Sequence, residues 1–304
     1  MSASKILGPI EHIVVLMFEN RSFDNMLGNL YPYGPEFDGV PPDYSNPVDP
    51  DRPDSPVVKA FHAPTGYPAR VMPFPDPNED YDDMAEQIRG GTMLGFVQNY
   101  AKAMKARGLP PERANEIMQF YKSGTGGNIP ITSWLAKQYA VSDRYFGSGP
   151  VQTWPNRLFA HCGTPGSYVK DGKRYAYLNN IDYPNYHDLD PFQGQLDYKT
   201  VFELLDRKHV GRTGKAWKVY YDGEVPISAF LKYVHKHWNT FEGGNVYAYR
   251  SDIYADFASD VRNDELPTYS FIEPRYQKYS LHGTIPPNSN HPGGSTVDEG
   301  LPPI

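Results

Sequence analysis

The sequence predicts an α/β protein with a largely parallel sheet, and an apolar run near the N-terminus is the first indication. Every side chain from Ile13 to Phe18 is apolar, and neither Gly nor Pro interrupts the run. Strands buried on both faces of a parallel sheet have this composition. Two later segments, Ala216–Tyr221 and Leu266–Glu273, also have the character of strands. Helical patterns in the chain between these segments complete the α/β prediction.

The helical segments are predicted from the spacing of apolar residues. From Met84 to Ala106 they recur at helical spacing, and Gly90-Gly91 divides the segment into two helices. The Pro-rich segment 30–83 has too many aromatic residues for a solvated tether, so we predict a long loop packed over the sheet beside the site. We predict further helices at 111–121, 130–139, 153–161, 200–207, 227–237 and 254–261, and a short strand at 140–142.

Composition bounds the class of protein. The chain has 304 residues and a formal net charge of −7, which argues against bulk electrostatic binding to nucleic acid or anionic membrane. The chain has a single cysteine, Cys162, so it cannot form an internal disulfide. We expect Cys162 to be buried and to behave as a small apolar residue. No segment has the length of a transmembrane helix, and residues 1–9 lack the regions of a secretory signal. We therefore expect one domain over residues 1–304, either intracellular or with its signal removed.

Polar side chains follow the apolar run at once. Glu19 and Asn20 come directly after Phe18, which places them at the carboxyl end of a strand, where open α/β sheets bind ligands. A carboxylate and an amide oxygen suit Mg²⁺, Ca²⁺ or Mn²⁺ and are tolerable for Zn²⁺. The alternative is that both residues only solvate the strand end, with Ser22 or Asp24 capping a helix that begins near Phe23.

A second polar segment, Gly147–Gly163, predicts a turn followed by a helix that ends near His161. Pro155 suits the first turn, and Thr153 lies at or beside the N-cap. The unpaired N–H groups and positive dipole there favour a bound phosphate and stabilise an alkoxide, although most cap threonines catalyse nothing. Arg157, one turn further on, can clamp phosphate oxygens or pair with Asp143.

Four segments together resemble one family. Glu19–Asp24, ENRSFD, resembles the opening motif of the phosphoesterase family that holds bacterial phospholipases C, plant non-specific phospholipases C and bacterial acid phosphatases. The segment Thr153-x-Pro155-Asn156-Arg157 resembles its second motif. The segments 266–276 and 288–292, the latter NSNHP, resemble the third and fourth. The resemblance covers nearly the whole chain.

This resemblance implies a three-layer sandwich of the alkaline phosphatase type and metal-assisted hydrolysis of a phosphate ester. Thr153 would be the nucleophile and would also touch the metal ion that Glu19 and Asn20 hold. Asn156, in the first helical turn, and Arg157 would contact the phosphate. His291 would bind phosphate or protonate the leaving group, for which a pKa near neutrality suits it.

The alcohol side of the substrate is less well defined. Phospholipid cleavage to diacylglycerol and a phosphorylated head group is the first expectation. Acid phosphatase action on monoesters is the second, and a non-catalytic remnant that binds phosphate or lipid is an alternative from another class. A Ser-His-Asp hydrolase is disfavoured because no G-x-S-x-G segment occurs.

The chain also departs from the family pattern. Relatives carry Asp soon after His-Pro, whereas here residues 293–297 precede Asp298, so neither Asp298 nor Glu299 is assigned to a metal. Plant relatives have a His near Glu79, and its role is not carried over. Glu273 and Arg275 either orient the site or have a structural part. Because relatives continue into an Asp-Glu motif, we expect a chain incomplete at its C-terminus, with weak metal binding and an exposed sheet edge.

Overall fold

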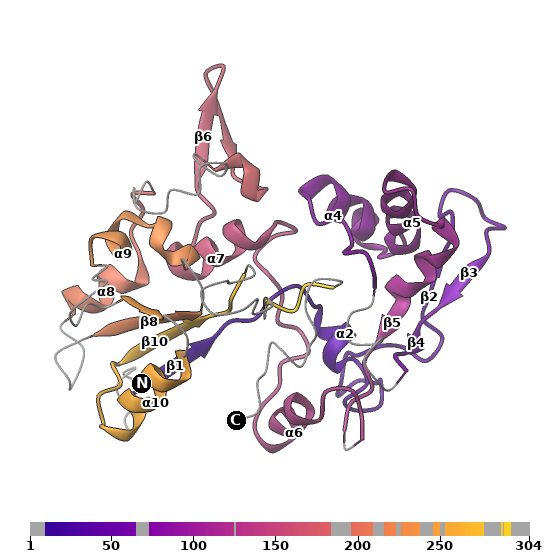
Figure 1. The fold of residues 1–304 in the computed structure, drawn as a ribbon. Coiled ribbons are helices and arrows are strands. Elements are labelled where there is room, and N and C mark those ends of the chain that lie inside the picture. The colour runs from indigo at the N-terminus through magenta and orange to yellow at the C-terminus, as the bar shows by residue number, and fades with distance from the viewer. Residues whose placement is uncertain are drawn as a thin grey trace. The chain divides into compact units, whose positions relative to one another are not determined.

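The structure is a computed structural model that divides into two compact units (Figure 1). Unit 1 comprises Met1–Phe18 and Thr153–Pro287, and unit 2 comprises Glu19–Gln152 and Asn288–Ile304. The chain therefore passes from one unit to the other three times. One domain over residues 1–304 stays a prediction, and each unit is described by itself. The structure describes residues 10–64, 73–124, 126–183, 196–208, 216–222, 226–237, 246–249, 253–276, 287 and 289–292.

A parallel sheet forms the centre of unit 1. Its strands lie in the order β1-β10-β8-β9, and every neighbouring pair is parallel. The predicted parallel α/β fold is therefore confirmed, in a form compatible with a sandwich of the alkaline phosphatase type. The strands are β1 (Ile13–Leu16), β8 (Trp217–Asp222), β9 (Val246–Tyr249) and β10 (Tyr269–Glu273).

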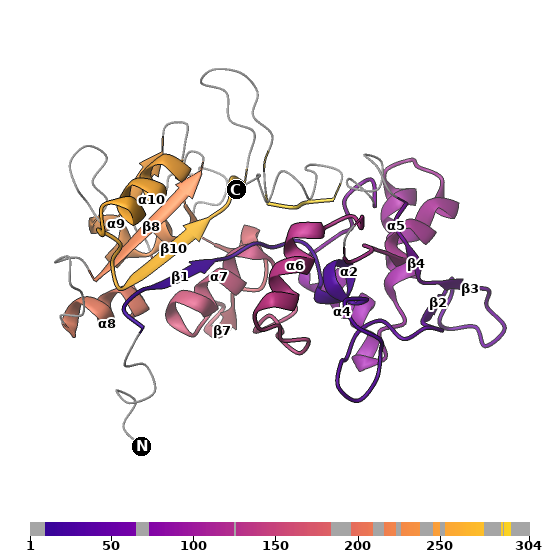
Figure 2. The ribbon, with the colours of Figure 1, turned by 90° about the horizontal axis from the view of Figure 1, so that it is seen from below.

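Alternate side chains of β8 face two helical layers. Trp217, Val219 and Tyr221 pack into the main core with α7 (Thr153–Cys162), α8 (Val201–Arg207) and α9 (Lys232–Lys236). Lys218 and Tyr220 point to the opposite face, where both bind Asp260 of α10 (Ile253–Arg262). Figure 2 shows α10 on one face of the sheet and α8 on the other. The period-two alternation of a strand thus gives unit 1 its three layers.

The predicted burial of β1 on both faces is wrong. Among the described strands, β10 is its one partner, so β1 lies at the edge of the sheet. Val15 packs against the core beside Phe271, but Val14 is 43% exposed and Leu16 is 48% exposed. Those two lie on the face that α10 covers over β8 and β9. The apolar run specifies a strand, whereas the strand order decides how much of it is covered.

Smaller elements complete unit 1. The hairpin of β6 (Ser167–Lys170) and β7 (Lys173–Ala176) is antiparallel. The helix predicted at 227–237 is divided into the 3-10 helix η5 (Ile227–Phe230) and α9, and a further 3-10 helix, η3, comprises Asn180–Asp182.

Unit 2 is largely helical. Its first helix, α2 (Phe23–Leu27), begins as predicted, with the Ser22 hydroxyl accepting the Asn25 N–H at 3.1 Å. The predicted division at Gly90-Gly91 is confirmed, since Gly90 has a φ of 65° there. The predicted strand at 140–142 is wrong, because this segment has no regular structure. The remaining helices are α4 (Tyr81–Ile88), η1 (Arg89–Gly91), α5 (Phe96–Ala106), η2 (Pro111–Met118) and α6 (Pro130–Gln138), and the short strands are β2 (Ser45–Pro47), β3 (Val57–Lys59), β4 (Phe61–His62) and β5 (Gln119–Phe120).

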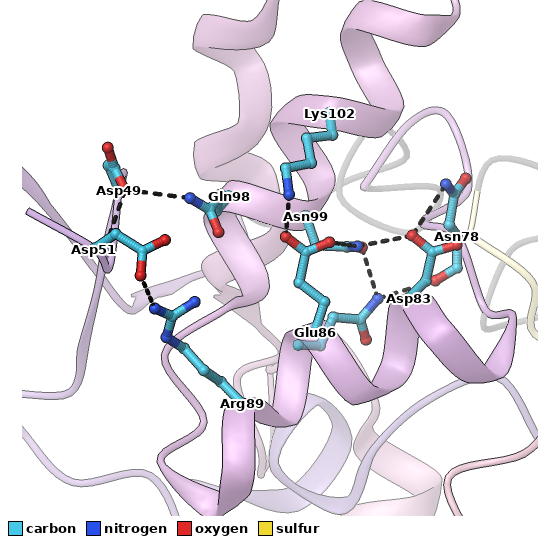
Figure 3. Close-up of polar contacts among 10 residues, drawn as sticks. Asp49, Asp51, Asn78, Asp83, Glu86, Arg89, Gln98, Asn99 and Lys102 are labelled. Carbon is cyan, nitrogen blue, oxygen red and sulfur yellow. Dashed lines mark hydrogen bonds and ion pairs between the residues drawn. The ribbon is translucent and has the colours of Figure 1, made fainter.

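A polar network joins α4 to α5 (Figure 3). The buried Asn99 donates through Nδ2 to Asp83 Oδ1 at 2.7 Å and to Glu86 Oε2 at 3.0 Å. Its Oδ1 accepts from Gln87 Nε2 at 2.9 Å. Lys102 pairs with Glu86 at the rim of the network. One buried amide therefore satisfies three polar side chains of α4 and fixes the two helices against each other.

Candidate active site

The first and fourth motifs meet in unit 2, although 269 residues separate them. Asn20 Nδ2 donates to the Ser289 carbonyl at 2.7 Å. Arg21 Nε donates to the Asn290 carbonyl at 3.1 Å. These two hydrogen bonds hold the turn after Phe18 against the residues that lead into His291. The structure thus brings together Glu19, Asn20 and His291, as the two motifs predict.

Both segments have a left-handed residue at their contact. Asn20 has a φ of 68° and Asn290 has a φ of 63°. Asn tolerates this region better than most residues with a Cβ, and such conformations gather at functional sites. The two asparagines therefore allow the backbone to turn where the first and fourth motifs meet.

His291 lies among carboxylates. Its Nδ1 forms a short contact with Asp76 Oδ2. Burial opposes protonation of the ring, but the hydrogen bond and charge of Asp76, with the charges of Glu79 and Glu19, outweigh it and raise the pKa of His291. The imidazole is thereby held in its protonated form to a higher pH than a free histidine, as a proton donor requires.

Glu79 is the second acid of this cluster. Gln152 Nε2 donates to its Oε1 at 3.3 Å. Burial raises the pKa of Glu79, and the charges of Asp76 and Glu19 act in the same direction, against His291. Sequence reasoning assigned no role to Asp76 or Glu79. The feature of the sequence that could have indicated them is the spacing of Asp76 and Glu79, two acids three residues apart. They stand in a Pro-rich segment with too many aromatic residues to be a solvated linker.

Asn20 is oriented in a way that suits a cation. Because Nδ2 faces the Ser289 carbonyl, Oδ1 is the oxygen that the side chain can offer to a ligand. Glu19 adds a carboxylate, and carboxylate and amide oxygens are hard donors. No group of three His, Cys, Asp or Glu side chains arranged for a metal occurs among the described residues. Glu19 and Asn20 thus have the donor chemistry that a divalent cation prefers.

The second motif lies in unit 1, at the start of α7. Thr153 is the first helical residue, and both Thr153 and Asn156 are half-buried. The Trp154 N–H donates to Asn180 Oδ1 at 2.9 Å, so a side chain of η3 satisfies one of the first N–H groups of the helix. That group was expected to be unpaired, and a distant residue supplies a cap that the local sequence does not show.

Arg157 is fully buried in unit 1. Its Nη2 donates to the Met17 carbonyl at 2.9 Å, and its guanidinium lies 5.1 Å from the centre of the Tyr276 ring. This places a structural contact of Arg157 on the segment that follows β1, directly before Glu19. A role in phosphate binding stays a prediction for Arg157, as it does for Asn156.

Glu273 has a structural part in unit 1. The buried carboxylate accepts the N–H groups of Ile227 at 2.9 Å and Ser228 at 3.1 Å, and the Tyr276 hydroxyl at 2.8 Å. It therefore holds the start of η5.

Cys162 is half-buried, and burial raises the pKa of its thiol to about 12, which fits an unreactive apolar residue. Asn288, Asp298 and Glu299 lie outside the described residues.

Comparisons with known proteins agree with these motifs. The Phosphoesterase family model matches residues 10–301. The chain is 31% identical over 297 residues to non-specific phospholipase C1 of Arabidopsis thaliana, covering 95% of this chain and 46% of the relative. It is 28% identical over 305 residues to phospholipase C B of Mycobacterium tuberculosis, covering 93% and 53%. The chain thus spans about half the length of the curated relatives it matches. The match over residues 10–301 shows that this chain belongs to the Phosphoesterase family.

Proposed function

We propose that this chain carries a phospholipase C-type activity, the hydrolysis of a phospholipid to diacylglycerol and a phosphorylated head group. The observation that carries the proposal is the meeting of Glu19, Asn20 and His291 through the Asn20–Ser289 and Arg21–Asn290 hydrogen bonds. Carboxylate, amide and imidazole groups are those that bind a cation and move a proton beside a phosphate. The relatives named phospholipases C support the substrate class.

The reaction divides into two displacements at phosphorus. In the first, Thr153 Oγ bonds to phosphorus and gives its proton to water, while the leaving alcohol takes the electron pair of the broken P–O bond and a proton from His291. In the second, water bonds to phosphorus and returns a proton to His291, and Thr153 Oγ leaves and regains a proton from solvent. The motif Thr153-x-Pro155-Asn156-Arg157 supports the nucleophile, with Asn156 and Arg157 proposed to contact phosphate.

A divalent cation, Ca²⁺, Mg²⁺, Mn²⁺ or Zn²⁺, is part of this proposal. Glu19, Asn20 and Thr153 are the residues proposed to hold it, as their motifs indicate. A bound cation supplies charge that screens the phosphate oxygens and lowers the pKa of the attacking hydroxyl.

The test is release of p-nitrophenol from p-nitrophenylphosphorylcholine by the whole chain, with each of the four cations added after treatment with EDTA. We expect turnover that EDTA abolishes and one cation restores. Thr153→Ala should lower kcat for this ester by about 10²-fold or more, because the nucleophile forms the new bond to phosphorus, and His291→Ala should do the same for a short-chain phosphatidylcholine, whose leaving alcohol needs a proton. His62→Ala is the matched control, since His62 is a histidine of unit 2 in β4.

Two outcomes would count against the proposal. Hydrolysis of p-nitrophenyl phosphate with none of the phosphocholine diester would make the chain a monoester phosphatase. Folded protein that binds inorganic phosphate in calorimetry but hydrolyses neither ester would make it a non-catalytic binding protein.

A further inference from the structure

Asp76 contacts His291 in unit 2 but belongs to none of the four motifs. Several hydrogen bonds fix the backbone around it. Arg107 Nη1 donates to the Asp76 carbonyl at 2.8 Å, and the Tyr100 hydroxyl donates to the Pro75 carbonyl at 2.5 Å. The Phe74 N–H donates to Glu116 Oε2 at 3.2 Å. Bonds from α5 and to η2 thus hold the backbone on both sides of the Asp76 side chain.

His291 is held from the other side. The carbonyl groups of Ser289 and Asn290, the two residues before it, accept hydrogen bonds from Asn20 and Arg21. Neither partner of the Asp76–His291 contact therefore depends on a loose loop. When hydrogen bonds fix the backbone of both residues, their side chains stay aligned with each other. A residue that takes part in a reaction needs such fixed positioning.

We propose that Asp76 is a positioning residue for His291. Its carboxylate accepts the Nδ1–H of the ring, so that Nε2 is the nitrogen that exchanges a proton with the leaving oxygen. This inference rests on the proposed phosphoesterase function. Asp76 itself touches no reacting atom in this scheme.

The chemistry follows from the two nitrogens. As the P–O bond breaks, its electron pair moves to the leaving oxygen, and Nε2–H gives that oxygen a proton. The ring keeps its other proton on Nδ1, where the Asp76 carboxylate stabilises it. A water proton restores Nε2–H in the second displacement. An amide in place of Asp76 can donate to Nδ1 and favour the wrong tautomer, with the proton on Nε2 of the neutral ring.

The test compares two esters of phosphocholine that differ in the leaving group. A short-chain phosphatidylcholine releases an alcohol, which needs a proton, whereas the p-nitrophenyl ester releases a phenolate that needs little help. We expect Asp76→Asn to lower kcat by about 10²-fold for the phosphatidylcholine and only a few-fold for the p-nitrophenyl ester. Asp76→Glu should recover part of the loss. Asp80→Asn is the matched control, because Asp80 is exposed and makes no side-chain cap bond.

Equal losses on both esters would overturn the proposal, because a merely structural residue would lower both alike. A second readout does not depend on turnover. The ¹⁵N chemical shifts of His291 in the wild-type chain should show the Nδ1–H tautomer in its neutral form, and Asp76→Asn should shift the ring toward Nε2–H. Unchanged shifts would also overturn it. If the wild-type chain hydrolyses neither ester, the proposed function fails, and the NMR result alone decides the role of Asp76.

Discussion

At the scale of single residues, His161 is a buried histidine in an apolar setting. It is 2% exposed in the last turn of α7, with its ring centre 4.6 Å from that of Phe271 and 5.2 Å from that of Phe202. Burial lowers the pKa of His161 to about 4, and the charge of Arg157 acts in the same direction, against Glu273. The folded chain therefore keeps this ring neutral at a pH where an unfolded chain protonates it.

This difference makes the stability of unit 1 depend on pH. Between pH 6.5 and about 4 the unfolded state binds a proton that the folded state does not, so the free energy of unfolding falls as the pH falls. The loss amounts to roughly 3 kcal/mol across the window. His161→Leu should remove this part of the slope, as urea unfolding at pH 7 and pH 4.5 can measure. His62→Leu, at an exposed position of β4, should leave the slope largely intact. An unaltered slope in His161→Leu would contradict the expectation.

The residues of the candidate site were predictable to different degrees. Glu19, Asn20 and His291 stand in motifs, and the structure brings them together as expected. Asp76 was not predictable, because 215 residues separate it from His291 and only the fold makes them neighbours. The cap that Asn180 provides to α7 was missed for the same reason.

At the scale of elements, the network around Asn99 fixes α4 to α5. Asn99→Leu keeps the volume but removes the hydrogen bonds to Asp83, Glu86 and Gln87. These side chains keep further bonds to Asn78 or Lys102, so the loss is that of three hydrogen bonds, and we expect the free energy of unfolding to fall by about 2–3 kcal/mol. Urea unfolding followed by far-ultraviolet circular dichroism measures this loss. Gln98→Leu removes one hydrogen bond between described residues, from the Gln98 amide to Asp49, and should cost less than about 1 kcal/mol. Equal losses of unfolding free energy in both variants would show that the Asn99 network stabilises the chain no more than the single hydrogen bond of Gln98.

Helices and strands were largely predictable from periodicity, whereas their neighbours were not. Gly90-Gly91 marks a helix boundary by local chemistry, so α4 and α5 follow from sequence. The segment 111–121, predicted as one helix, contains the 3-10 helix η2 and then β5, and the pairing of β5 with β4 accounts for the end of the helical pattern at Met118. The position of β1 at a sheet edge depends on strand order, which an apolar run does not contain.

At the scale of the whole molecule, neither unit is one continuous stretch of chain. Unit 2 is completed by residues 288–304, which bring Ser289, Asn290 and His291 to the first motif. None of the helices in the described part of the chain is long and apolar enough to cross a membrane.

A shortened chain tests the importance of that returning segment. A chain of residues 1–287 lacks His291 and the carbonyl groups that hold Asn20 and Arg21. We expect it to keep the core around Trp217 but to lose at least about 10²-fold in turnover of a short-chain phosphatidylcholine, whose leaving alcohol needs the proton of His291. Near-ultraviolet circular dichroism checks the core, and the ester assay checks the site. Activity equal to that of the whole chain would show that the returning segment is dispensable.

The long separation between Asn20 and Ser289 also sets an order of events during synthesis. At about 5–20 residues per second, a ribosome needs on the order of tens of seconds to make the chain between them. For all that time the turn carrying Glu19 and Asn20 exists without the histidine it will face. The nascent chain can therefore fold the helices of unit 2 early, but it cannot complete the site until translation has passed residue 291.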